Sequence, residues 1–141
     1  MKRNRVLWLL GMLICFVPNG YLSAADLDCL KRIDKIAGSV RKDVVLYSDE
    51  FKVMSDNPWA RNSESTCKGA LQRAESYYQR QVDDKSVCEL GSSYVDSQVV
   101  QLYKNAGSTC RSEYDTLVNR LSPEDRQIAL DRFARKQAMQ H

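Results

Sequence analysis

The clearest pattern in the chain is a run of apolar residues that recur at alternating steps of three and four. Its members are Leu30, Ile33, Ala37, Val40, Val44, Tyr47, Phe51 and Met54. This spacing puts one apolar side chain per turn on a single helical face, so it predicts a helix over residues 27–55 with that face in the core. Asn57-Pro58 ends the helix. A stripe of this length can also face a second copy of the chain, which would give a homodimer through the first helix.

Weaker stripes predict two further helices in the middle of the chain. The first opens near Asn62-Ser63 and ends either at Asp83-Asp84 or at Leu90. The second follows Ser92-Ser93, because serine caps helix starts, and it ends at Gly107, because glycine suits the residue just past a helix.

The remaining residues predict one or two more helices. Ser108 or Thr109 caps a helix, and the residues of that helix that face inward are Cys110, Tyr114, Leu117, Val118 and Leu121. Ser122-Pro123, followed by two acids, is the strongest helix start in the chain, and the apolar residues after it are Leu130, Phe133, Ala134 and Ala138. The predicted fold is therefore all-α, a small bundle of four to five helices.

The first 25 residues have the pattern of a signal peptide. Lys2, Arg3 and Arg5 precede an apolar stretch over 6–17, and Ser23-Ala24-Ala25 supplies the small residues that signal peptidase requires. We expect residues 1–25 to be removed and residues 26–141 to form one periplasmic or secreted helical domain. The apolar stretch is shorter than the roughly 20 residues of a spanning helix, so no stable membrane span is expected after cleavage. An uncleaved anchor is the alternative.

Cleavage changes the charge of the chain. The full sequence has 21 basic and 18 acidic residues, and the first 25 contain three basic residues and no acid. The mature chain is therefore neutral, with both signs interleaved along it. This balance argues against a nucleic-acid partner, which needs a clustered positive field.

Four cysteines stay in the mature chain, namely Cys29, Cys67, Cys88 and Cys110. An even number in an oxidising compartment predicts two disulfides. In an up-and-down bundle Cys29 and Cys88 lie at one end, and Cys67 and Cys110 lie in the opposite half, which predicts the pairs Cys29–Cys88 and Cys67–Cys110. A Cys67–Cys88 bridge stays open if the second helix breaks at Asp83-Asp84.

Catalytic and metal chemistry have weak sequence support. The only histidine is His141, and no two cysteines have CxxC spacing, so we expect no nucleophilic triad and no zinc site. The acidic pairs Asp49-Glu50, Asp83-Asp84 and Glu124-Asp125 are typical of solvated helix surfaces and caps. We expect no enzyme, no catalytic residue and no cofactor.

The aromatic residues of the middle helices are the candidate partner-binding set. They are Trp59, Tyr77, Tyr78, Tyr94 and Tyr103. Tryptophan and tyrosine often anchor protein interfaces, although these residues also suit the border of a core. Tyr77 and Tyr78 are adjacent, about 100° apart on a helix, so only one of them can face inward.

The general plan combines a signal peptide, two disulfides, compact helices and a neutral surface. It is similar to the plan of small periplasmic inhibitor and immunity proteins, although no motif matches residue by residue. The leading hypothesis is a non-enzymatic protein that occludes a toxin or a cell-wall hydrolase. The alternatives are a carrier of small apolar ligands between the helices and an assembly subunit of an envelope complex.

Overall fold

The protein is an all-helical bundle held by two disulfides, as the sequence predicts. The computed structural model describes residues 24–83, 88 and 97–140. The helices in these ranges are α2 (Ala24–Val53), α3 (Pro58–Asp83), α4 (Gln98–Asn119) and α5 (Pro123–Met139). Residues 1–23 of the predicted signal peptide and Tyr94 lie outside the described residues, and the signal peptide stays a prediction.

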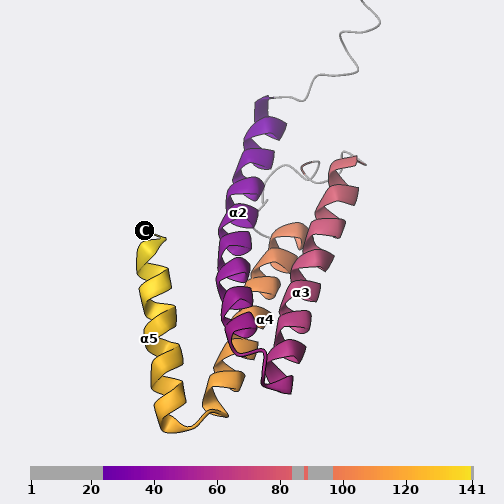
Figure 1. Cartoon of the computed structure of the whole chain (residues 1–141). Coiled ribbons are helices and arrows are strands. Elements are labelled where there is room, and N and C mark those ends of the chain that lie inside the picture. Colours follow the sequence, from indigo (N-terminus) through magenta and orange to yellow (C-terminus); the bar gives the residue numbers. More distant parts are fainter. Residues whose placement is uncertain (1–23, 84–87, 89–96, 141) are drawn as a thin grey trace, which may run out of the picture.

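Successive helices run in opposite directions, and three of them form the body of the molecule (Figure 1). Helices α2, α3 and α4 pack against one another, with α3 and α4 making the most extensive pair. Helix α5 lies beside α2 and α4 and, within the described ranges, makes no contact with α3. The molecule is therefore a three-helix bundle with a fourth helix attached to one side.

The heptad stripe of α2 forms the centre of the core. Ile33, Ala37 and Phe51 have no exposed surface, and Val44 is almost fully buried. Helices α3 and α4 of the same chain cover this face. The stripe that the alternative of a homodimer would use is therefore already covered within one chain, and the oligomeric state stays a prediction.

Helix α3 begins at Pro58, earlier than the predicted start near Asn62-Ser63. The Asn57 side chain accepts a hydrogen bond from the Trp59 backbone N–H at 3.0 Å, so Asn57 caps the helix. Pro58 then occupies the first turn, where its missing N–H is not needed. The same Asn-Pro pair thus ends the α2–α3 connection and starts α3.

The predicted helix break at Gly107 is wrong, because α4 runs through it without interruption. Its buried face is continuous on both sides of the glycine, with Val100, Tyr103, Ala106, Cys110 and Tyr114 at steps of three and four. Glycine lowers helix stability by about 1 kcal/mol, and packing of this long face against α2 and α3 exceeds that penalty. Ser97 caps the start of α4, because its side chain accepts from the Val100 N–H at 3.3 Å.

The disulfides connect Cys29 with Cys88 and Cys67 with Cys110. This is the pairing that the up-and-down arrangement predicts, and the Cys67–Cys88 alternative does not form even though α3 ends at Asp83. Cys110 lies in the middle of α4, not at the start of a separate helix. The pairing survives that error because Cys110 still lies in the same half of the bundle as Cys67.

Helix α5 starts at the predicted cap, where the Ser122 side chain accepts from the Asp125 N–H at 3.2 Å. Its inward face is narrower than the predicted apolar set. Ala129 is buried and Phe133 packs against the core, whereas Leu130, Ala134 and Ala138 are exposed. Helix α5 therefore contributes little apolar contact area.

Within the part of the chain that the structure describes, no helix combines the length and the apolar character needed to cross a membrane.

Candidate functional site

Trp59 is the largest exposed aromatic side chain of the described residues, and it lies at one end of the bundle. Its exposed fraction is 56%. It stands in the first turn of α3, where the Asn57 cap fixes the backbone. An indole left half in water forgoes about 3 kcal/mol of burial free energy. This free energy is gained if another molecule covers the ring.

Arg120 holds the Trp59 ring from the neighbouring connection. Its guanidinium carbon lies 4.1 Å from the ring centroid, within the range of a cation–π interaction. Arg126 fixes the backbone on which Arg120 stands, because it donates to the carbonyls of Val118, at 3.2 Å, and Asn119, at 3.0 Å. The α2–α3 and α4–α5 connections are thereby joined into a rigid end face, which we call the Trp59 end.

The predicted partner-binding tyrosines do not share the exposure of Trp59. Tyr103 has no exposed surface and Tyr78 is buried, so neither can contact a partner in the folded chain. Tyr77 is half-buried and donates a hydrogen bond to Gln98 at 3.2 Å. Of the predicted set, Trp59 is therefore exposed, Tyr77 borders the core, and Tyr78 and Tyr103 belong to the core.

The two core tyrosines instead complete a polar layer between α2, α3 and α4. Arg41 of α2 binds both carboxylate oxygens of Glu75 on α3, and its Nη2 lies 2.8 Å from Oε2. The Tyr103 hydroxyl donates to the same carboxylate at 2.5 Å, and Tyr78 donates to Asp34 at 2.8 Å. The Arg41 hydrogen bonds lower the pKa of Glu75, and burial raises the pKa of Tyr103.

A groove of about 740 Å³ separates α5 from α2 and α4. Its wall contains three aromatic rings, since Phe133 stacks on Tyr47 and on Tyr114 with centroid distances of 5.0 and 4.7 Å. Its other lining is mixed, with Leu130 beside the charged residues Asp43, Lys104, Arg111 and Asp115. Burial raises the pKa of Tyr114 to about 12. The groove is thus partly apolar inside and charged at its rim.

A buried ion cluster next to this groove attaches α5 to α2. The Glu50 side chain has no exposed surface and receives Arg132 at 2.8 Å and Lys136 at 2.7 Å. The sequence predicts that Asp49 and Glu50 are both solvated, and this prediction is wrong for Glu50. The sequence signal for its burial is its position beside the heptad stripe, one turn after Leu46, which is also buried.

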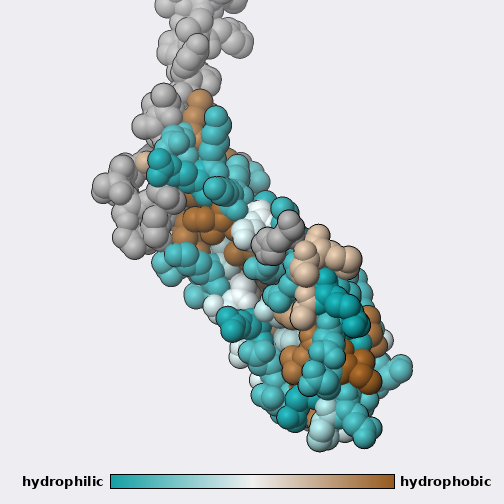
Figure 2. All heavy atoms as spheres, turned by 90° about the vertical axis from the view of Figure 1, so that its left-hand side faces the viewer, coloured by the Kyte–Doolittle hydropathy of each residue, from teal (hydrophilic) through white to brown (hydrophobic). Residues whose placement is uncertain are grey.

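The molecule viewed from the α5 side shows hydrophobic side chains in separate patches within a largely hydrophilic surface (Figure 2). No cluster of three or more metal-ligating side chains occurs within residues 24–83, 88 and 97–140. Comparison with known protein families, curated proteins and solved structures finds no match to this chain. The candidate sites of the described residues are therefore the Trp59 end and the groove.

Proposed function

We propose that this protein is an exported, non-enzymatic binding protein that docks on another protein and occludes it, such as a toxin or a cell-wall hydrolase. The observation that carries the proposal is the Trp59 end, where an exposed indole is held in one orientation by Arg120. Tryptophan and arginine are the residues most enriched among those that dominate binding energy at protein interfaces.

The stapled bundle suits this role because it is rigid before binding. Two disulfides and the Asn57 cap limit the motion of the backbone around Trp59. A surface that is already ordered loses little conformational entropy when a partner docks. The disulfides are also compatible with an oxidising compartment, which is where the predicted signal peptide would send the chain.

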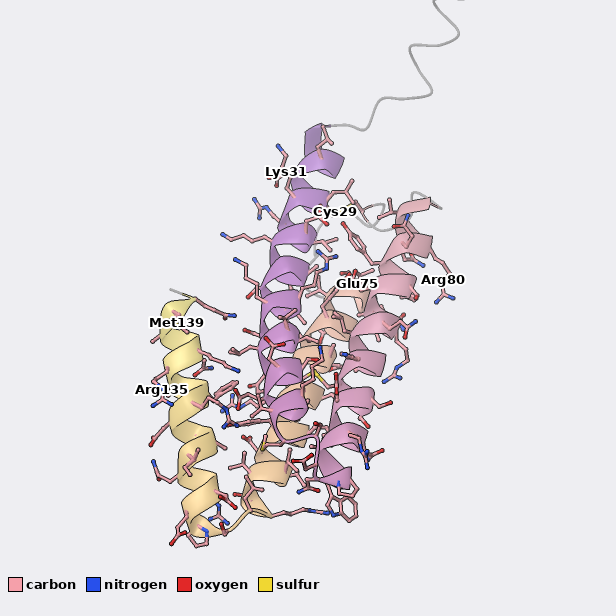
Figure 3. All side chains as sticks on the ribbon, in the orientation of Figure 1. Cys29, Lys31, Glu75, Arg80, Arg135 and Met139 are labelled. Atoms are coloured by element: carbon pink, nitrogen blue, oxygen red, sulfur yellow. A yellow bond between two sulfur atoms is a disulfide. The ribbon has the colours of Figure 1, made fainter. Side chains whose placement is uncertain are left out.

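Site-specific photocrosslinking tests the proposal. We would place p-benzoylphenylalanine at position 59 and, as a matched control, at Arg135, which is exposed on the outer side of α5 (Figure 3). In the cells that naturally make the protein, position 59 should give one discrete adduct with an exported protein, and position 135 should give none. Equal labelling at both positions, or no adduct at position 59, would contradict the proposal.

The groove favours a second candidate, a carrier of small apolar ligands. Its volume lies in the range of ligand pockets and its wall is aromatic. Its charged rim and exposed mouth suit an apolar cargo less well than an enclosed cavity would. A native protein that increases the fluorescence of anilinonaphthalene sulfonate, and loses this effect in the Leu130→Asp variant, would favour the carrier.

Export is tested separately, by determining the N-terminal residue and the reactivity of the thiols. The protein purified from its native compartment should begin at Asp26 and should react with a thiol-alkylating reagent only after reduction. An intact chain with reactive thiols in the cytosol would contradict export to an oxidising compartment, on which the proposal depends.

A further inference from the structure

We propose that the outer face of α3 is a second part of the docking surface and that it recognises an acidic surface on the protein partner. The inference rests on the proposed function and names the chemistry of that partner. The face carries four exposed basic side chains, which we call the α3 basic face. They are Arg61, Lys68, Arg73 and Arg80.

The α3 basic face is long and has one sign of charge. From Arg61 to Arg80 it covers about 28 Å of helix at 1.5 Å per residue. Over residues 58–82, the acidic side chains of α3 are Glu64 and Glu75, and both are only partly exposed. Figure 3 shows Arg80 pointing away from the bundle and Glu75 toward α2. The interleaving of charges seen in the sequence is therefore lost on this face.

The acids close to α3 are each held by a partner inside or beside the bundle. Glu75 is bound by Arg41 and Tyr103. Glu64 accepts from Lys68 at 2.6 Å and from Ser48 at 3.3 Å, and Lys68 thereby lowers the pKa of Glu64. Glu113 of α4 accepts from Ser63 at 2.9 Å. These carboxylates turn toward the neighbouring helices.

The cations of the α3 basic face are in contrast largely uncommitted. Among the described residues, neither Arg61 nor Arg73 has a carboxylate within ion-pair distance. Arg80 lies over the Tyr77 ring at 5.9 Å, a contact that leaves its N–H groups free to donate at the ring edge. Three of the four cations are arginines, whose planar guanidinium groups match carboxylates in two-point contacts.

The centre of the face permits close approach between the basic residues. Ser65, Gly69, Gln72 and Ser76 lie there and are small or flexible and neutral. The Arg73 Nη1 lies 3.6 Å from where a Cβ on Gly69 would be, an ordinary van der Waals distance, so the guanidinium lies close to Gly69. A partner element that contacts this neutral strip therefore meets basic side chains on both of its sides.

A protein explains these features better than a membrane or a nucleic acid. Trp59, which carries the proposed function, lies in the first turn of the same helix as the α3 basic face. The mature chain is neutral overall, whereas nucleic-acid binding draws on a large excess of positive charge. Over residues 61–80 the face offers no exposed large hydrophobic side chain for insertion into a lipid surface.

Charge reversal with a matched control tests the inference. The test variant is Arg61→Glu, Arg73→Glu and Arg80→Glu, and the control is Lys35→Glu, Lys42→Glu and Arg135→Glu, which changes the net charge equally on exposed parts of α2 and α5. Binding to poly-L-glutamate, phosphatidylglycerol vesicles and a short DNA duplex is measured at low salt by fluorescence anisotropy or cosedimentation. Circular dichroism checks that both variants fold.

We expect the test variant to bind polyglutamate at least about tenfold more weakly than the native protein and the control to stay within about threefold. Equal losses in the two variants, or no binding of polyglutamate by the native protein, would overturn the inference. Tighter binding of the vesicles or of the duplex through the same three arginines would overturn it in favour of a membrane or a nucleic acid. The absence of a crosslinked adduct at position 59 would instead contradict the proposed function, and it would not change the outcome of this charge test.

Discussion

The three-helix body and helix α5 are stabilised in different ways. Helices α2, α3 and α4 share the apolar core and both disulfides. Helix α5 is attached through Ala129, Phe133 and the ion cluster of Glu50 with Arg132 and Lys136. No disulfide reaches it. The body therefore depends on burial and covalent linkage, whereas α5 depends on a small apolar contact and a few polar contacts.

This difference indicates that the two regions open separately. Bringing Glu50, Arg132 and Lys136 together out of water carries a desolvation penalty that offsets much of their attraction. Regions with little buried apolar area open locally at lower free energy than the global core. We therefore expect α5 to detach while the body stays folded. Four predictions, in order of decreasing effect, test this comparison.

Removing the Cys67–Cys110 disulfide should destabilise the body strongly. The bridge closes a loop of 43 residues, and the loop-closure model gives about 4 kcal/mol for a loop of this length. The Cys67→Ser and Cys110→Ser double variant should lose this free energy of unfolding in a urea titration followed by circular dichroism. A loss below about 1 kcal/mol would show that helix packing alone holds the body.

Removing the Glu50 charge should destabilise α5 selectively. Glu50→Gln leaves Arg132 and Lys136 beside a buried amide, but both cations are about one-quarter exposed and can turn to water. We expect a loss of about 2–3 kcal/mol, below the full penalty for an uncompensated buried charge.

Hydrogen exchange locates the Glu50→Gln effect. The amides of α5 should exchange faster in the variant, while those of α3 and α4 keep their native rates. Combining Glu50→Leu with Arg132→Met and Lys136→Met should recover most of the lost stability, because an apolar cluster has no desolvation penalty. Faster exchange throughout the bundle would contradict the separation of the two regions.

Acid should weaken the polar layer of the body. The pKa of Glu75 is lowered by Arg41, so in the folded state Glu75 stays ionised at pH values where the unfolded chain binds a proton. Its contribution is complete above the ordinary glutamate pKa of about 4.3 and is lost as the pH falls through the lower folded value. Urea midpoints measured between neutral and acidic pH should fall less steeply in Glu75→Gln than in the native protein. Parallel curves would contradict this assignment.

Gly107→Ala should stabilise α4 slightly. A Cβ at this position would lie 3.9 Å from Val40 Cγ1, an ordinary contact, and alanine favours the helix by up to about 1 kcal/mol over glycine. We expect a rise of about 0.5–1 kcal/mol in the free energy of unfolding. A decrease would show that the packing beside Val40 tolerates no added methyl group.

The sequence predicts the features of the body that arise from local patterns. The heptad stripe locates the inward face of α2, and Ser122-Pro123 locates the start of α5, because spacing and capping act within a few residues. An up-and-down arrangement predicts the disulfide pairing, although the sequence divides α4 in two and leaves a Cys67–Cys88 bridge open. These features need no knowledge of side-chain contacts.

The remaining features depend on contacts between distant residues. Gly107 has a helix-ending propensity, and only packing of the continuous α4 face overrides it. Glu50 becomes a buried ion-cluster residue only when α5 brings Arg132 and Lys136 against it, 82 residues further on for the arginine. The exposed face of α3 looks neutral in sequence because the partners that turn Glu64 and Glu75 inward lie on other elements.

The two sulfur bridges also determine how the backbone behaves when it is cut. Cys29–Cys88 ties the first helix to the segment after the second, and Cys67–Cys110 ties the second to the third. A protease nick between α2 and α3, or between residues 88 and 97, leaves all pieces in one covalent molecule. A nick at Arg120 leaves α5 with no covalent link to the body, so a single cut there allows the C-terminal helix to dissociate under non-reducing conditions.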